Sequence, residues 1–319
     1  MNYQLAIDPS GQFEKFSVEK LIDNSTTDFD TFIQLKKHFI LYSGNGYKWQ
    51  REELTSLLSQ GHGELYIRRQ DQRKVKMYES VASLPKIEKE QAPKERINSI
   101  QQVAAKFTEC LYEGEITESC VKKAEQISSE IVNCISEDSQ CIKYLSGLAD
   151  HDYYTYYHSV RVSTYAVAVA LSMGLTDQAS LRDLAIGGLF HDIGKKNIPL
   201  EVLNKSGALT ENEWQLMRAH PTMGFEDMPT HLLSHVPREM ILHHHEKRNG
   251  SGYPDGLNHR SLLYEVQIAT LADIYDALTS SRSYQAKRTR YEALDFIKHK
   301  LLNEEVCPEA FKALIECLA

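Results

Sequence analysis

The amino-acid sequence predicts two domains, a small N-terminal α/β or α+β domain followed by an all-α bundle. Three observations support this fold class. The chain has 319 residues, enough for about two separate cores. Apolar residues show mixed spacing up to about residue 92 and helical spacing from Glu95 onward. Between them lies SLPKIEKEQAPKE, a charged stretch with two prolines that is typical of a linker. We therefore expect domains at 1–92 and 148–319, with a helical linker at 93–147 packing on the second.

Three segments define the expected N-terminal domain. HFILYSGNGYKW predicts a hairpin, with Gly44, Asn45 and Gly46 at the turn. REELTSLLSQG fits a short helix that ends at Gly61. GELYIRRQDQRKVKMYES predicts strands around a polar turn.

The second domain is predicted to be helical throughout. Ile97, Ile100, Val103 and Phe107 recur at the spacing of one helix face. Further helices are predicted at about 154–173, 177–191, 210–219, 236–245, 264–280 and 290–302. His158 lies on an apolar face of the first of these helices, so we expect its side chain in the core.

Composition excludes several classes of protein. A net charge of −8 argues against a partner that is a nucleic-acid polymer, although a local site can still bind a small anion. The N-terminus predicts no secretory signal, and no stretch approaches the roughly 18 apolar residues of a membrane helix. The six cysteines form no CxxC pair and are expected to be reduced thiols. We therefore expect a cytoplasmic protein without a membrane partner.

Ten of the thirteen histidines fall between residues 151 and 259, which locates the candidate chemistry. His191 and Asp192 directly follow an apolar helix, where charge is costly unless it is paired or bound to a metal. The other candidates on apolar helices are His158, His220, His243, His244, His245 and Asp273. Each could singly be a surface histidine, a helix cap or a salt-bridged aspartate. Together they form a nitrogen and oxygen donor set that suits iron, manganese, zinc or nickel, and their number indicates two metals.

A glycine-rich loop follows the histidine run. In HHEKRNGSGYPDGL, Gly250, Gly252 and Gly256 permit a backbone that approaches a ligand closely, and Pro254 stiffens the loop. A tight connection between helices is the alternative interpretation. It does not explain why the loop begins at adjacent histidines.

These motifs carry a family resemblance. HDxGK at residues 191–195, HHE at 244–246 and GYP at 252–254 resemble the HD-GYP family, whose members hydrolyse the bacterial messenger cyclic di-GMP. The similarity runs from about Tyr153 to Phe311 and includes HSVRV, LTENEWQLMRAHP and ADIYDALTSSRSY in the family's order. The resemblance implies an HD-type helical bundle and a phosphodiesterase that produces linear pGpG, GMP or both.

The resemblance also implies roles for individual residues. Asp192 would bridge two divalent ions, most often iron in such sites, with manganese as the alternative. The remaining ligands would be His191 and Asp273 on one ion, His220, His244 and His245 on the other, and His158 as a further ligand. Asp192 and Lys195 would take part in catalysis, the latter by pairing with phosphate. Lys195, Gly252, Tyr253 and Arg282 would line the substrate site.

Several positions depart from the family pattern. Ser283 and Gln285 replace a proline and a basic residue, and Asn249 stands where aspartate is frequent. Three-metal members carry a glutamate four residues before the first histidine, where this chain has Tyr154, so we expect two ions. Asp152, the nearest carboxylate, is predicted to point away from His158.

Three functions remain open on the sequence alone. The chain could hydrolyse cyclic di-GMP, another dinucleotide such as cyclic GMP-AMP or the linear product, or it could be a non-catalytic receptor. The domain at 1–92 could be a sensor, a dimerisation module or a docking surface for a signalling partner.

Overall fold

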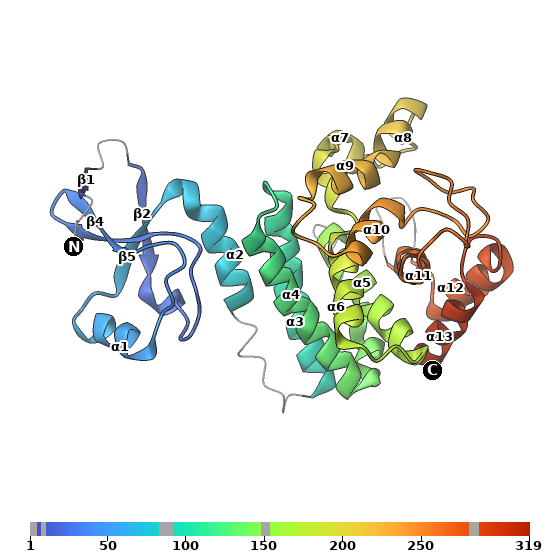
Figure 1. Ribbon diagram of the computed structural model, residues 1–319, viewed down its shortest axis with the longest axis horizontal. Helices are drawn as coiled ribbons and strands as arrows, with labels where there is room; N and C mark the ends of the chain where they lie inside the picture. Colours follow the sequence, from blue (N-terminus) through green and yellow to red (C-terminus); the bar gives the residue numbers. More distant parts are fainter. Residues whose placement is uncertain (1–4, 8–10, 83–91, 148–153, 281–286) are drawn as a thin grey trace. The chain divides into compact units, whose positions relative to one another are not determined.

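The computed structural model describes residues 5–7, 11–82, 92–147, 154–280 and 287–319 (Figure 1). Its contacts divide the chain into two compact units, Met1–Pro85 and Lys86–Ala319. The coarse prediction, a small domain with a sheet followed by a mostly helical one, is confirmed.

The first unit is built on one antiparallel sheet with the strand order β1-β4-β3-β5-β2. Its strands are β1 (Leu5–Ile7), β2 (Phe13–Ser17), β3 (Thr31–Leu35), β4 (His38–Ser43) and β5 (Glu64–Arg68). Two helices, α1 (Arg51–Ser59) and α2 (Gln72–Ala82), complete the unit. Its core contains Phe29, Trp49 and Leu65, which are almost fully buried. Aromatic residues of this size supply much of the apolar area that a small domain can bury.

Two predictions for this unit are wrong. β4 pairs with β3 and β1, so its hairpin turn lies at Lys36, where φ is 58°, and not at Gly44–Gly46. The glycine turn leads instead to an isolated bridge between Lys48 and Thr26. The segment after β5, predicted as a strand, is the helix α2. Its buried residues Val75, Tyr78 and Val81 are three apart, which is helical spacing.

The second unit is a bundle of helices. The longer ones are α3 (Pro93–Tyr112), α4 (Glu118–Glu137), α5 (Tyr154–Ser172), α6 (Gln178–Phe190), α11 (Tyr264–Thr279) and α13 (Pro308–Leu318). The shorter ones are α7 (Leu200–Leu203), α8 (Glu211–Arg218), α9 (His220–Asp227), α10 (His235–His243) and α12 (Arg290–Phe296), which continues as a π turn at Ile297–Leu301. Two 3-10 segments lie at Ser139–Gly147 and Ile193–Asn197. All six predicted helix ranges correspond to helices, whereas α7, α9 and α13 were not predicted.

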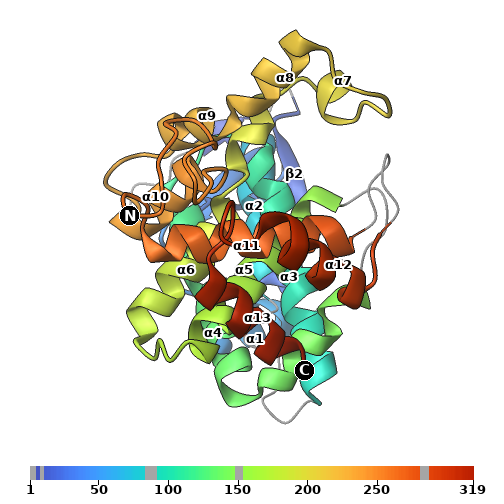
Figure 2. The same cartoon turned by 90° about the vertical axis from the view of Figure 1, so that its right-hand side faces the viewer.

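Helix α5 is the centre of this bundle (Figure 2). Every residue from His158 to Ala170 is buried, because α3, α4, α6, α11 and α13 all pack on α5. Its contact with α6 depends on a glycine, since a Cβ at Gly188 would lie 2.5 Å from the Cα of Ser163. This close approach holds the end of α6, which precedes His191, against α5, which carries His158.

The helix boundaries follow ordinary capping chemistry. Asp177 caps α6 by accepting a hydrogen bond from the backbone N–H of Ser180. Thr210 and Glu213 form a reciprocal capping box at the start of α8. Within the described residues, no helix is both long enough and apolar enough to cross a membrane.

Candidate metal centre

The HDIGK segment places two candidate ligands at the end of α6. His191 follows the last residue of α6, and Asp192 precedes the 3-10 turn that contains Gly194. A Cβ at Gly194 would lie 2.0 Å from the carbonyl oxygen of His220, so only glycine allows α9 to approach this turn. The glycine therefore brings His220 next to Asp192.

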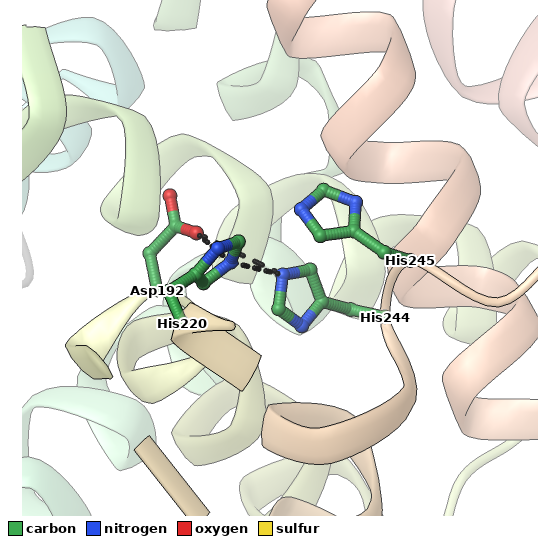
Figure 3. A group of neighbouring side chains, drawn as sticks. All are labelled: Asp192, His220, His244 and His245. Carbon is green, nitrogen blue, oxygen red and sulfur yellow. Dashed lines mark hydrogen bonds and ion pairs between the residues drawn. The ribbon is translucent and has the colours of Figure 1, made fainter. Parts of the chain in front are cut away.

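The seven predicted ligands lie together in two groups. Asp192, His220, His244 and His245 form one group, and His158, His191 and Asp273 form the other; within each, the donor atoms are within 4.8 Å of one another. In Figure 3 the four side chains of the first group point toward a common centre. They come from the turn after α6, the start of α9 and the end of α10, three segments that are far apart in the sequence.

Asp192 stands between the two groups. Its Oδ1 is 3.2 Å from Nε2 of His220 and 3.7 Å from Nε2 of His244. Its Oδ2 is 3.3 Å from Nε2 of His191 and 3.6 Å from Nε2 of His158. Each oxygen of Asp192 thus faces different histidines, one toward His220 and His244 and the other toward His158 and His191.

Backbone carbonyls orient three of the imidazoles. Nδ1 of His191 donates to the carbonyl of Gly188, and Nδ1 of His220 donates to that of Met217, both at 2.8 Å. Nδ1 of His244 is 3.1 Å from the carbonyl of Met240. Because a carbonyl only accepts, the proton of each neutral ring is on Nδ1. The Nε2 lone pair of each ring is therefore left for a metal.

The fourth imidazole has a charged partner that the sequence reasoning missed. Nδ1 of His158 lies 2.7 Å from Oδ2 of Asp276, which is fully buried and also bonded to Arg161. A signal was present: Arg161 follows His158 by three residues, and Asp276 follows Asp273 by three, which places each pair on one helix face. Nε2 of His158 then lies 3.1 Å from Asp273.

The protonation states suit a metal site. Burial alone would raise the pKa of Asp192, but His191 and Lys195 outweigh it and hold the pKa well below its usual range. Burial likewise opposes ionisation of Asp273, yet its contact with His158 lowers the pKa well below the ordinary value. Burial lowers the pKa of His245 to about 3 and that of His244 well below its usual value. These shifts favour ionised carboxylates at Asp192 and Asp273 and neutral imidazoles at His244 and His245.

Two buried atoms of the cluster make no hydrogen bond within the described residues. They are Nε2 of His191 and Oδ1 of Asp192. A buried polar atom without a partner costs roughly 1–3 kcal/mol, so it is uncommon in a folded protein. Oδ1 of Asp192 faces the Nε2 atoms of His220 and His244, and Nε2 of His191 lies 3.3 Å from Oδ2 of Asp192, so both atoms point at other candidate ligands. The residues present therefore fit divalent metal.

The GYP loop is held by Glu246, whose side-chain role the sequence did not predict. Its carboxylate accepts hydrogen bonds from the backbone N–H groups of Asp255 (2.7 Å), Gly256 (2.8 Å) and Leu257 (3.1 Å). Gly252 packs so closely that a Cβ would lie 2.4 Å from the Cα of Glu246. The loop thereby places the Tyr253 ring 4.9 Å from that of His245.

Two further candidates differ in their relation to the centre. Nζ of Lys195 lies 2.6 Å from Oδ2 of Asp192, so this side chain does reach the ligand cluster. His243 points elsewhere, since its ring nitrogens bond Glu239 and Asp255. Its place in the histidine run therefore does not make it part of either ligand group.

Some predictions fall outside the described residues. These positions are Arg282, Ser283, Gln285, Asp152 and the side chain of Tyr154. Asn249 is described, and its side chain accepts hydrogen bonds from the backbone and hydroxyl of Ser251. At this position the side chain stabilises the loop itself.

Part of the cluster is exposed to solvent. Asp192 is almost completely buried, whereas the side chains of Asp273, Lys195 and His245 are 13%, 21% and 27% exposed. Tyr253 is half-buried beside them. A ligand can therefore reach the cluster from the side formed by these four residues, which we call the mouth.

Comparison with known proteins agrees with this fold. Residues 145–303 match the HD domain family. A cyclic di-GMP phosphodiesterase of Pseudomonas aeruginosa is 33% identical over 196 residues, which are 61% of this chain and 47% of that protein. One from Thermotoga maritima is 32% identical over 198 residues, covering 60% and 53%. The chain thus spans about half the length of these curated relatives.

Two further comparisons concern specificity and fold. The 3′3′-cGAMP-specific phosphodiesterase 3 of Vibrio cholerae is 35% identical over 167 residues, 52% of this chain and 35% of that protein. Bd1817, an HDG"Y"P protein from Bdellovibrio bacteriovorus, has a similar structure with a TM-score of 0.66 and 20% identity, covering 96% of this chain and 99% of that chain. At that identity the likeness shows the fold alone.

The helical bundle and its histidine-aspartate cluster define an HD-domain protein. With the GYP loop attached to the ligand run, the chain belongs to the HD-GYP family.

Proposed function

We propose that this chain is a metal-dependent phosphodiesterase that hydrolyses cyclic di-GMP to linear pGpG, GMP or both. The observation that carries the proposal is the position of Asp192. One of its oxygens faces His220 and His244, and the other faces His158 and His191. This arrangement supports two ions held by one shared carboxylate, as in enzymes that displace an oxygen from phosphorus.

The cluster residues would share two divalent ions. His158, His191 and Asp273 would hold one, His220, His244 and His245 the other, and Asp192 both. Such ions supply Lewis acidity toward a phosphate oxygen and lower the pKa of a bound water. The soft thiolate ligands that favour other metals are missing from both groups, so iron or manganese suits the donor set.

The residues around the cluster would bind and orient the substrate. The ammonium of Lys195 is paired with the carboxylate of Asp192. A substrate phosphate is also an anion, so it can compete with Asp192 for this ammonium and pair with it. Tyr253 borders the mouth, and burial raises its pKa, so the phenol stays neutral and can donate a hydrogen bond. Glu246 holds the loop that positions Tyr253, and Gly252 permits its close approach. Arg282 would add a further cation to the substrate site.

The relatives support a second substrate. Both cyclic di-GMP and 3′3′-cGAMP phosphodiesterases are among the similar proteins, at 33% and 35% identity. The phosphodiester linkages of these compounds are alike, so the metal centre cannot distinguish them. Hydrolysis of 3′3′-cGAMP is therefore the alternative function.

The first unit would regulate the second from within the cytoplasm. We place the boundary of this regulatory domain at residue 92, followed by a helical linker segment at 93–147 and the catalytic domain at 148–319. The unit would bind a signal, a partner protein or a second copy of the chain.

One assay tests the proposed function. The full chain is loaded with Fe(II) or Mn(II) without oxygen and incubated with cyclic di-GMP, 3′3′-cGAMP or pGpG. We expect metal-dependent release of pGpG or GMP from cyclic di-GMP, and none from Asp192→Asn. Tight binding of intact cyclic di-GMP without turnover would instead identify a receptor.

A further inference from the structure

Arg218 stacks on the tyrosine of the GYP loop. It is the last residue of α8, and its Cζ lies 4.6 Å from the centroid of the Tyr253 ring. That ring lies 4.9 Å from His245, and the backbone N–H of Tyr253 donates to the carbonyl of His245. The Tyr253 ring thus lies between the guanidinium of Arg218 and the candidate metal ligand His245. Arg218 therefore belongs to the mouth, although it comes from a different segment of the chain.

Arg218 has no anionic partner among the described residues. The side chain is exposed and forms no ion pair or hydrogen bond with any described residue. Lys195, the other described cation of the mouth, is paired with Asp192. A guanidinium that lies over an aromatic ring and forms no hydrogen bond keeps its N–H groups free for an anion.

Packing of helix α8 does not explain why an arginine stands at position 218. It buries none of its own side chains, and its N-terminus is held by the capping box of Thr210 and Glu213. The helix runs directly into α9, which carries His220 (Figure 2). Arg218 thus lies two residues before the candidate ligand His220, while its side chain remains exposed to solvent.

We infer that Arg218 binds the second phosphate of a cyclic dinucleotide, the one that is not being cleaved. This inference rests on the proposed function. A cyclic dinucleotide carries two phosphates in one small ring, so a second cation near the metal centre can bind one while the centre holds the other. The planar guanidinium edge matches two phosphate oxygens. Arg218 would then favour cyclic dinucleotides over substrates that have a single phosphate.

Steady-state kinetics of the manganese-loaded full chain test this role. The substrates are cyclic di-GMP, 3′3′-cGAMP and bis(p-nitrophenyl) phosphate, which has one phosphate and no base. For Arg218→Ala we expect KM to rise about 10- to 100-fold for both cyclic dinucleotides, with kcat nearly unchanged. Activity toward bis(p-nitrophenyl) phosphate and the metal content should stay at the wild-type level. Arg218→Lys should restore part of the loss, because it keeps the charge without the fork.

Arg238→Ala is the matched control. Arg238 stacks on Phe225 at 4.5 Å, an equivalent contact with an aromatic ring that is not part of the mouth. We expect its KM values for all three substrates to equal those of the wild type.

Three results would overturn the assignment. An unchanged KM of Arg218→Ala for the cyclic dinucleotides would show that Arg218 does not bind the second phosphate. Equal losses on all three substrates together with lost metal would show that Arg218 only supports Tyr253 and His245. A rise in KM for only one of the two cyclic dinucleotides would show that Arg218 contacts a base and not the second phosphate. If the wild type cleaves bis(p-nitrophenyl) phosphate but neither cyclic dinucleotide, the proposed function itself fails, and this case is identified before any variant is compared.

Discussion

At the scale of single residues, the centre separates side chains that would hold metal from those that would hold substrate. Lys195 and Tyr253 lie at the mouth, and neither belongs to a ligand group. We expect Lys195→Ala and Tyr253→Phe to keep their metal and to lose turnover or substrate affinity by about tenfold or more. Elemental analysis beside kinetics checks this. Loss of metal from Lys195→Ala would show instead that the lysine is needed to orient Asp192.

The buried pair behind His158 gives a second prediction at this scale. Asp276→Asn leaves Arg161 buried without its carboxylate, which should cost roughly 3–5 kcal/mol of unfolding free energy. Metal affinity should also fall about 10- to 100-fold, since Asp276 orients His158. Urea unfolding and metal titration measure the two effects. Glu118→Ala is the control, because it breaks only the exposed pair with Lys122 and should change stability by less than about 1 kcal/mol.

The same carboxylate predicts a pH dependence of stability. Burial opposes ionisation of Asp276, but Arg161 and His158 outweigh it and lower the pKa from 3.8 to about 2. A carboxyl whose pKa is lower in the folded state stabilises the fold above its unfolded pKa. The contribution of Asp276 is therefore complete at neutral pH and is lost as the pH falls from about 4 toward 2. In Asp276→Asn this part of the acid dependence should disappear.

What the sequence could predict at this scale depended on the kind of residue. The ligands stand in motifs. HDxGK, HHE and the first aspartate of ADIYD mark five of the seven residues that the structure gathers, and HSVRV and LTENEWQLMRAHP contain the other two, His158 and His220. The residues that orient the ligands and the GYP loop do not stand out in the sequence in this way. Asp276 and the loop contacts of Glu246 emerge only when helices and loops pack in three dimensions.

At the scale of elements, the approach of α9 to the turn after α6 depends on Gly194. Replacing it with alanine sets a Cβ 2.0 Å from the carbonyl of His220 and 2.5 Å from the N of Gly224. Because both neighbours are backbone atoms, we expect α9 to shift, His220 to leave Asp192, and metal content to fall. Gly207→Ala is the control, since nothing lies within 4 Å of the added methyl group. Normal metal content in Gly194→Ala would contradict this account.

The elements also show where reading the sequence failed. In RKVKMYESV, Val75 and Met77 alternate with polar residues, as in a strand, while Val75, Tyr78 and Val81 have the spacing of a helix. The structure buries both sets in the helix α2. Local spacing alone could not decide between the two, because a short helix can be buried on more than one face.

At the scale of the whole molecule, the chain has two units with separate cores. Deleting residues 1–92 should leave a helical domain that unfolds cooperatively and still binds metal, because the whole ligand set and the bundle lie in the second unit. Circular dichroism with metal analysis tests this. An insoluble or unfolded fragment would show that the first unit is required for the fold of the second.

The central claim is that Asp192 joins two metal sites, and the most direct test is anomalous diffraction from manganese-loaded, substrate-free crystals. Asp192 has one oxygen toward each ligand group, so we predict two manganese peaks, one on each side of its carboxylate. Two ions that share a carboxylate should lie about 3.5–4 Å apart. A single peak, or a well-occupied third peak between His158 and Lys195, would contradict this account.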